Sequence, residues 1–201
     1  MPIRRNDPTT NTELMARLMV GERKKRQRGQ TEKEIELQTL KTWAKSPVNF
    51  LLGKCPFSGE PVWKTQDEHD EEDPYKGLPN KAYIRNMLDI YQNERIVICE
   101  KSRQMIVSTL TCAYIAWEVL FVQGRLWLIS KTKEMDAVAL MRDKIRGPHS
   151  RLPAWSRKYL PMSKAPAKEI VCSGSGSRIL AVTENVARSS GRGMTASGFF
   201  L

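Results

Sequence analysis

The sequence predicts an α/β protein in which a parallel sheet is flanked by helices, with a helical extension at the amino-terminal end. Between residues 81 and 145, two short apolar runs alternate with helical apolar patterns. Such alternation favours parallel strands joined by right-handed crossovers. The chain has 201 residues, of which 40% are hydrophobic, so one medium domain can bury a core.

The amino-terminal part has a different character from the rest. An apolar pattern that runs into a basic cluster predicts a short helix within residues 14–28. The cluster is either a DNA contact or a solvated helix face. Thr31 opens a capping-box pattern, which predicts a helix that passes through Trp43 and ends near Pro47. Between residues 50 and 79, glycine, proline and an acidic run predict a surface loop or linker.

The second half of the chain is more regular, and its elements follow from their apolar patterns. Helices are expected over about residues 81–91, 107–121 and 134–145, and strands over 96–99, 126–129, 169–172, 178–183 and 197–201. The run at 96–99 has the pattern of a buried strand. The strands at 169–172 and 178–183 are expected to form a hairpin. We therefore divide the chain into a basic extension and linker, 1–79, and an α/β core, 80–201.

Charge and composition narrow the classes of partner and location. The net charge of +11 points to an anionic partner, for which nucleic acid is the usual candidate. Four cysteines form no CxxC pair, which favours a reducing compartment. No run approaches the roughly 18 apolar residues that a membrane span requires, and residues 1–7 lack a signal-peptide core. The sequence thus predicts a cytoplasmic protein with no membrane partner.

The loop between the strand at 96–99 and the next helix is the candidate phosphate site. In α/β proteins such a loop places unpaired N–H groups and the helix dipole toward a ligand. The usual phosphate-binding motif is GxxxxGK[ST]. The same frame here reads Lys101, Ser102, Arg103, Gln104, Met105, Ile106, Val107, Ser108. Only the final hydroxyl matches. Ile106 stands where the second glycine belongs, and a β-branched residue is strained at positive φ.

Three segments of the chain, taken in order, resemble a known family. Residues 101–108, followed by Thr109 to Tyr114 and Trp117, resemble the Walker A region of large terminase subunits of tailed phages, with Lys-Ser-Arg-Gln as the specific core. Ser130-Lys131-Thr132 with Asp136-Ala137 is similar to the segment after that family's second strand. Residues 192–201 resemble the lead into Walker B. The resemblance covers about residues 80–201 and implies a P-loop NTPase-type fold.

The resemblance also implies roles for the loop residues. Lys101 would reach the β- and γ-phosphates of ATP in place of the lysine absent at Val107, and Arg103 would stabilise the transferring phosphate. Ser108 would ligate Mg²⁺ together with a Walker B acid that the resemblance places after Leu201. The remaining residues would offer mainly backbone N–H groups, or line the loop: Ser102, Gln104, Met105, Ile106, Val107 and Thr109. Lys101 and Arg103 are alternatively loop cations or salt-bridge partners.

In that family's terms, the chain is the ATPase part of a bacteriophage or prophage DNA-packaging motor. The resemblance implies a hydrolase that moves double-stranded DNA into a capsid, normally with a carboxyl-terminal nuclease. It also implies a portal protein, a small terminase subunit and a ring of copies on the portal, in the cytoplasm of the bacterial host. We expect the 201 residues alone to be inactive. The alternatives are a non-catalytic DNA-binding or assembly module with a degenerate nucleotide site, and a helicase-like ATPase.

Overall fold

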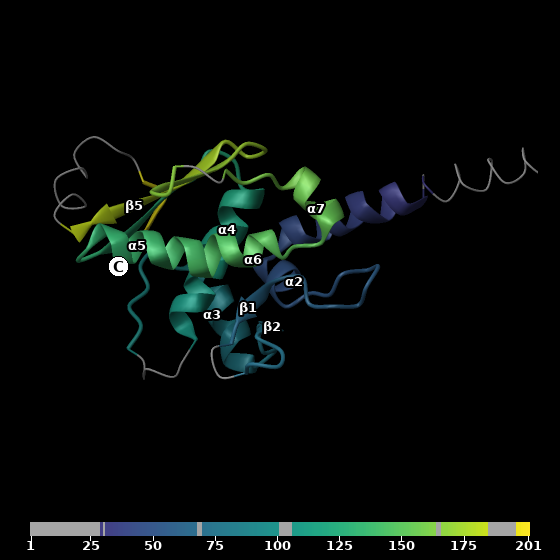
Figure 1. Ribbon diagram of the computed structural model, residues 1–201, viewed down its shortest axis with the longest axis horizontal. Coiled ribbons are helices and arrows are strands. Elements are labelled where there is room, and N and C mark those ends of the chain that lie inside the picture. The colour runs from purple at the N-terminus through teal and green to yellow at the C-terminus, as the bar shows by residue number, and fades with distance from the viewer. Residues whose placement is uncertain (1–28, 30, 68–69, 101–105, 164–165, 185–195) are drawn as a thin grey trace, which may run out of the picture. The chain divides into compact units, whose positions relative to one another are not determined.

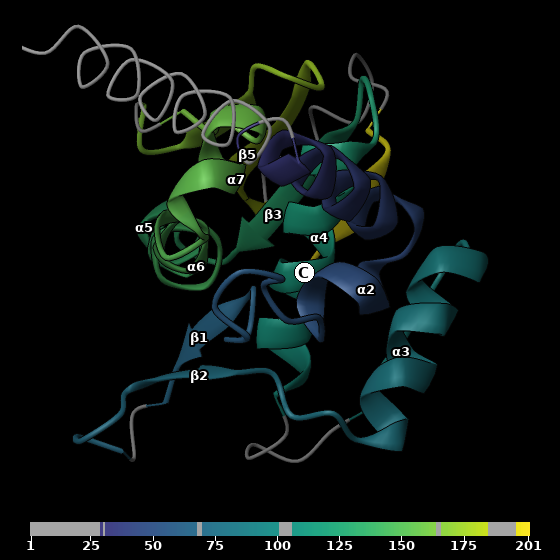
Figure 2. The same cartoon turned by 90° about the vertical axis from the view of Figure 1, so that its right-hand side faces the viewer.

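The computed structural model describes residues 29, 31–67, 70–100, 106–163, 166–184 and 196–201 (Figures 1 and 2). Two compact units divide the chain, with the boundary between Thr39 and Leu40. The predicted functional division at residue 79 is a separate matter and stays a prediction. The basic cluster within residues 14–28 lies outside the described residues.

The first described element confirms one predicted helix and its end near Pro47. Residues 31–45 are helical, and Ser46 is not. Pro47 opens a second helix, α2 (Pro47–Leu51), which was not predicted. Proline suits this first position because its fixed φ is already helical and no acceptor is needed for an N–H. The hydroxyl of Ser46 caps α2 by accepting a hydrogen bond of 3.2 Å from the Val48 amide.

The later elements include the predicted helices and four of the five predicted strands, together with β1, β2, α6 and α7, which were not predicted. They are β1 (Lys64–Gln66), β2 (Tyr75–Gly77), α3 (Ala82–Asn93), α4 (Val107–Phe121), β3 (Leu126–Lys131), α5 (Glu134–Met141), the π-helical turn η1 (Arg142–Arg146), α6 (Gly147–Ser150), α7 (Ala154–Tyr159), β4 (Glu169–Cys172), β5 (Ser177–Thr183) and β6 (Gly198–Phe200). The elements α5, η1 and α6 run end to end as one helical rod (Figure 1).

The main sheet is mixed, with four strands in the order β4-β5-β3-β6. Strand β3 pairs in parallel with β5 on one side and with β6 on the other, so that Leu128 lies opposite both Leu180 and Phe199. Strand β4 pairs antiparallel with β5, which confirms the predicted hairpin and corrects the all-parallel expectation. Alternate residues of β5 are buried, namely Ser177, Ile179 and Ala181, so one face of the sheet packs on the core.

The predicted buried strand at residues 96–99 does not form. Residues 96–100 have no assigned secondary structure, and the Ile96 and Ile98 side chains are 78% and 93% exposed. A strand is stable only when its backbone hydrogen bonds have a partner strand. The run at 96–99 pairs with no strand of the described sheet, whose order is β4-β5-β3-β6, and β3 itself is paired on both sides. The strand that should lead into the candidate phosphate loop is therefore outside the sheet.

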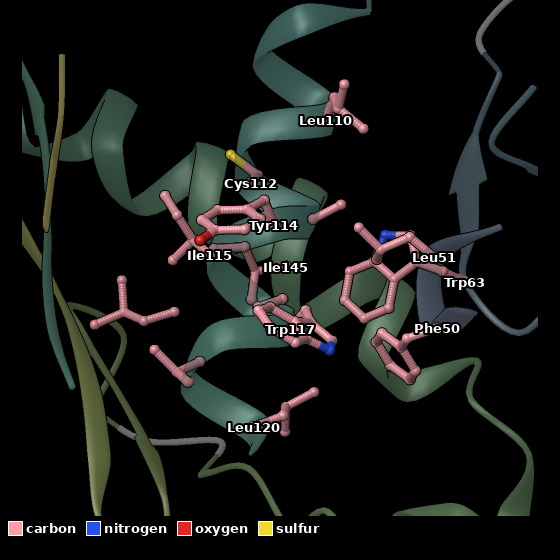
Figure 3. Packing of buried hydrophobic residues seen from close by; sticks show 14 of the residues in the cluster. Phe50, Leu51, Trp63, Leu110, Cys112, Tyr114, Ile115, Trp117, Leu120 and Ile145 are labelled. Atoms are coloured by element: carbon pink, nitrogen blue, oxygen red, sulfur yellow. The ribbon is translucent and has the colours of Figure 1, made fainter. Parts of the chain in front are cut away.

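The core is built around α4, which is buried almost all round, as expected of a helix apolar on every side. The segment 50–79, expected as a loop or linker, supplies part of this core and carries the antiparallel pair β1–β2. Figure 3 shows Phe50 and Trp63 of this segment gathered near Trp117 of α4. On α5 the two methionines differ in burial, since Met135 is 82% exposed while Met141 is fully buried.

Candidate functional site

The structure describes only residues 106–108 of the predicted phosphate loop, 101–108. Lys101, Ser102, Arg103, Gln104 and Met105 lie outside the described residues. Ile106, at the position of the motif's second glycine, is the N-cap of α4 with φ −74° and ψ 20°. No non-glycine residue among those described has a positive φ. The start of α4 therefore needs no left-handed residue, which is the conformation that the missing glycine would have served.

The other described loop residues differ in what they present to solvent. The Val107 side chain, at the position of the motif's lysine, is 6% exposed and belongs to the core. Ser108 and Thr109 are half-buried. The first N–H groups of any α-helix have no acceptor within the helix, so residues 107–109 can offer amide donors to a ligand. A phosphate would meet these donors and the Ser108 hydroxyl rather than a cation at position 107.

The orientation of α4 places its start at the carboxyl edge of the parallel strands. The Ser177 hydroxyl at the start of β5 donates a 2.6 Å hydrogen bond to the carbonyl of Val122, just after α4. The end of α4 thus lies beside the start of β5. A helix of 15 residues and a strand of 7 residues each span about 20 Å, so α4 begins near the carboxyl ends. In open α/β sheets, ligands bind at this edge.

Polar side chains also gather at the carboxyl ends of β3 and β5. Lys131, the last residue of β3, lies 5.2 Å from the centre of the Phe200 ring of β6. The Thr132 hydroxyl donates a 3.2 Å hydrogen bond to the carboxylate of Glu184, which follows β5. Burial raises the pKa of the Cys112 thiol, in the second turn of α4, to about 12, and the positive charge of Lys131 opposes this rise. This edge of the sheet therefore carries a lysine whose charge acts on α4.

A cavity of about 520 Å³ borders the start of α4. Ser108 and Thr111 of α4 line it, together with Val97 and Cys99 of the exposed apolar run and Gly198 to Leu201 at β6. Its volume is in the range of small-molecule sites. Among the predicted site residues that the structure describes, Val107 and Ser108 border this cavity.

Contacts between α3 and α4 fix one wall of this cavity. The Thr111 hydroxyl donates a 2.9 Å hydrogen bond to the Val107 carbonyl. The Tyr91 hydroxyl lies 2.8 Å from the hydroxyl oxygen of Thr111. Tyr91 is the donor of this hydrogen bond, because the single hydroxyl hydrogen of Thr111 is already used. Burial raises the pKa of the Tyr91 phenol, which keeps this donor protonated. The first turn of α4 is thereby held against the end of α3.

A buried acid that sequence reasoning missed also lines this cavity. The Glu118 side chain is only 11% exposed. One carboxylate oxygen accepts a 2.8 Å hydrogen bond from the Trp127 indole, and the other lies 3.0 Å from Nε of Arg125. Burial raises the pKa of this carboxyl group, against the lowering effects of Trp127 and Arg125. The sequence did contain one signal for this acid, because Glu118 is the single charged residue in the apolar stretch 107–121.

Within the described part of the chain, the structure contains neither a cluster of metal ligands nor a helix that could cross a membrane. There, no group of three or more His, Cys, Asp or Glu side chains could hold a metal ion. The expected Mg²⁺ ligand Ser108 thus has no such cluster of protein ligands around it among those residues. No helix in this part of the chain has the length and apolar character to cross a membrane.

Comparison with known proteins adds no family assignment. No protein-family model matches the chain, and a search of characterised proteins gives no significant match. The geometry at the start of α4 and the three segments that resemble terminases are therefore the observations from which a function can be proposed.

Proposed function

We propose that this chain contributes the nucleotide-binding part of a P-loop-type ATPase, with ATP and Mg²⁺ as its cofactors. The observation that carries the proposal is the position of α4, whose first amide donors begin at the carboxyl edge of β3 and β5, the edge at which Lys131 ends β3. A helix start at this edge binds phosphate in many α/β proteins, because its dipole and its N–H groups both favour an anion.

The proposed roles divide the loop between charge and positioning. Lys101 and Arg103 neutralise the phosphates and the charge that develops in phosphoryl transfer. The backbone N–H groups of residues 106–109 bind the phosphates. The hydroxyl oxygen of Ser108 is a ligand of Mg²⁺. Buried Val107 does not contact the nucleotide through its side chain. Hydrolysis also needs an acidic pair at Mg²⁺, which the resemblance places after Leu201, so we assign turnover to a protein that contains that pair.

We propose further that this ATPase drives double-stranded DNA into a viral capsid, as the ATPase part of a terminase large subunit. The net charge of +11 supports a polyanionic partner. The other proposed partners are a portal protein, a small terminase subunit and further copies of the chain in a ring on the portal. The proposed location is the host cytoplasm, at the procapsid, with a nuclease domain in the whole protein.

One observation favours a second candidate, a non-catalytic DNA-binding or assembly module. In P-loop proteins the phosphate loop follows a strand of the sheet. Here residues 96–99, which would be that strand, lie outside the sheet, and Ile96 and Ile98 are exposed. A loop without that support would hold phosphate less firmly. The two candidates differ in one property, which is specific binding of ATP with Mg²⁺.

Titration of the purified protein with a fluorescent ATP analogue, with and without Mg²⁺, tests the proposal. We expect saturable binding that Mg²⁺ strengthens and that Lys101→Ala weakens roughly tenfold, since a cation–phosphate hydrogen bond contributes about 1.5 kcal/mol or more. Ser108→Ala should reduce the Mg²⁺ effect specifically. Lys45→Ala, which removes an exposed lysine at the end of helix 31–45, is the matched control. Equal weakening by Lys101→Ala and Lys45→Ala, or no saturable binding, would leave the non-catalytic module as the better account.

A further inference from the structure

A second cavity, of about 380 Å³, lies at the end of the α5–η1–α6 rod. Its walls come from η1 and α6, from the last turn of α7, and from the residues that lead toward β4. The lining residues are Arg146, His149, Ser150, Arg157, Met162 and Ser163, with Pro161 beside them. It shares no lining residue with the cavity at the start of α4.

The polar groups in this cavity are almost all hydrogen-bond donors or cations. Two guanidinium groups, one imidazole and two hydroxyl groups line it, and no carboxylate is among its described lining residues. Arg157 makes no ion pair with any described residue. It lies in the last turn of α7 with Lys158, so the local charge is strongly positive. Such a set of groups suits an oxyanion, because guanidinium forks match the oxygen geometry of phosphate.

Hydrogen bonds to the backbone hold the cavity walls in place. One terminal nitrogen of Arg146 donates to the carbonyls of Pro166 and Glu169, each at 2.6 Å. The Ser163 hydroxyl oxygen accepts a 2.8 Å hydrogen bond from the Val171 amide. The hydroxyl hydrogen of Ser163 has no acceptor among the described residues, so it remains available to a ligand. A cationic group and a hydroxyl donor are thus positioned before any ligand binds.

His149 connects the cavity to protonation. One ring nitrogen, Nε2, lies 2.8 Å from the carbonyl oxygen of Leu160. A carbonyl only accepts, so Nε2 carries the hydrogen in the neutral ring and Nδ1 does not. Burial lowers the pKa of His149, and the positive charge of Arg157 lowers it further, while the Leu160 hydrogen bond opposes them. A bound anion would act in the opposite direction and favour the imidazolium form.

We propose that this cavity binds a phosphate group, either a free phosphate or a backbone phosphate of DNA. Arg157, His149 and the Ser163 hydroxyl are the ligand-binding groups, and Arg146 adds a fixed positive charge. The site is separate from the proposed nucleotide loop and does not depend on it. The lining groups come from three parts of the chain, since His149 belongs to α6, Arg157 to α7 and Ser163 to the segment before β4. His149 offers a hydrogen from Nδ1 only as the imidazolium, which is the form that a bound anion favours.

The pKa of His149, measured by NMR, tests the proposal directly. The chain has two histidines, and His149→Gln assigns the signal. Sodium sulfate is the probe, because its tetrahedral dianion keeps the same charge between pH 5 and 8, and sodium chloride of equal ionic strength is the control. We expect sulfate to raise the pKa of His149 by roughly half a unit or more. An identical pKa in sulfate and in chloride would overturn the proposal.

Two matched variants separate this site from general positive charge. Arg157→Gln should raise the pKa of His149 without sulfate and weaken sulfate binding roughly tenfold, the effect of one lost hydrogen bond to a charged group. Lys158→Gln removes the same charge from the same turn of α7, outside the cavity lining, and should do neither. Equal effects of the two variants would contradict a built site. Lys101→Ala should leave the sulfate response unchanged, which distinguishes failure of this site from failure of the nucleotide loop.

A short DNA duplex at low salt then identifies the source of the phosphate. If the backbone is the source, the duplex shifts the His149 signal and loses affinity in Arg157→Gln but much less in Lys158→Gln. If free phosphate is the source, sulfate and inorganic phosphate shift the signal while the duplex does not. Both results support the phosphate site. A response to neither anion nor duplex would overturn it.

Discussion

The carboxylate of Glu118 accepts a 2.8 Å hydrogen bond from the indole of Trp127, which joins α4 to β3 inside the wall of the larger cavity. The same indole lies against Gly198, where an added Cβ would come within 2.4 Å of the ring. One tryptophan therefore connects the core helix, the central strand β3 and the edge strand β6. This arrangement makes the position of β6 sensitive to changes in Glu118 and Gly198.

Glu118→Gln should change how stability depends on pH. Burial raises the pKa of Glu118 above its ordinary value of 4.5, so the folded state binds this proton more strongly than the unfolded state. The wild-type protein must then lose stability at this site as pH rises above 4.5 and through the folded-state pKa. Glutamine does not titrate. We expect the unfolding free energy of Glu118→Gln, relative to wild type, to increase over that range.

Urea unfolding at a series of pH values, followed by tryptophan fluorescence, measures this difference. Other titrating groups are common to both proteins and largely cancel. A difference that stays constant from pH 4 to pH 8, or that decreases, would show that Glu118 is not held in a desolvated environment.

Gly198→Ala should destabilise β6 through a clash with Trp127. The added methyl group cannot fit against the indole without a shift, and such overpacking costs about 1–3 kcal/mol. Trp127→Leu removes the ring atoms responsible, so Gly198→Ala should cost little in that background. A double-mutant cycle on unfolding free energies measures the coupling. Additive effects of the two substitutions would mean that β6 does not pack on Trp127.

Trp117→Phe should cost more than a substitution of the same size elsewhere in the core. The Trp117 indole donates a 2.8 Å hydrogen bond to the Trp43 carbonyl. The helical partner of that carbonyl would be the N–H of residue 47, which is proline and has none. Removal of the indole leaves a buried carbonyl unsatisfied, at about 1–3 kcal/mol.

Trp63→Phe is the matched control for this prediction. Trp63 is fully buried, and its indole nitrogen has no hydrogen-bond partner among the described residues. The same volume is lost there without loss of a hydrogen bond. Unfolding free energies of the two variants should therefore differ by the cost of the carbonyl, and equal losses would argue against the Trp117–Trp43 contact.

Ile98→Ala should be almost neutral, because its side chain is 93% exposed. We expect a change within about 0.5 kcal/mol. Ile129→Ala, at a fully buried position of β3, is the control and should cost about 2–5 kcal/mol. Chemical unfolding distinguishes the two. A cost at Ile98 similar to that at Ile129 would restore the original prediction of a buried strand at residues 96–99.

Local patterns predicted the helices and the hairpin well, and non-local pairing explains the main error. The run from Val107 to Phe121 forms a helix that is buried almost all round, because apolar residues lie on nearly every face of it. The run at 96–99 has an equally clear strand pattern, but a strand also needs a partner strand, and this run pairs with none of the described strands. Local sequence does not contain that information.

In the candidate site too, local features could be predicted from the sequence and tertiary contacts could not. Ser108 at the start of a helix could be predicted from its motif position, and it does border a cavity. The Glu118–Trp127 contact could not, because it joins α4 to β3 through tertiary packing. The cavity around Arg157 and His149 was missed as well. Its lining residues, from Arg146 to Ser163, lie in loops and short helices without a motif and come together only through folding.

Hydrogen exchange at the start of α4 tests the central claim most directly. Amide exchange of residues 106–110 would be measured with and without a non-hydrolysable ATP analogue and Mg²⁺. A phosphate bound at this helix start should slow exchange there, and Lys101→Ala should remove the protection while leaving the exchange of β3 and β5 unchanged. Identical exchange at residues 106–110 with and without saturating nucleotide would contradict a phosphate site at this helix.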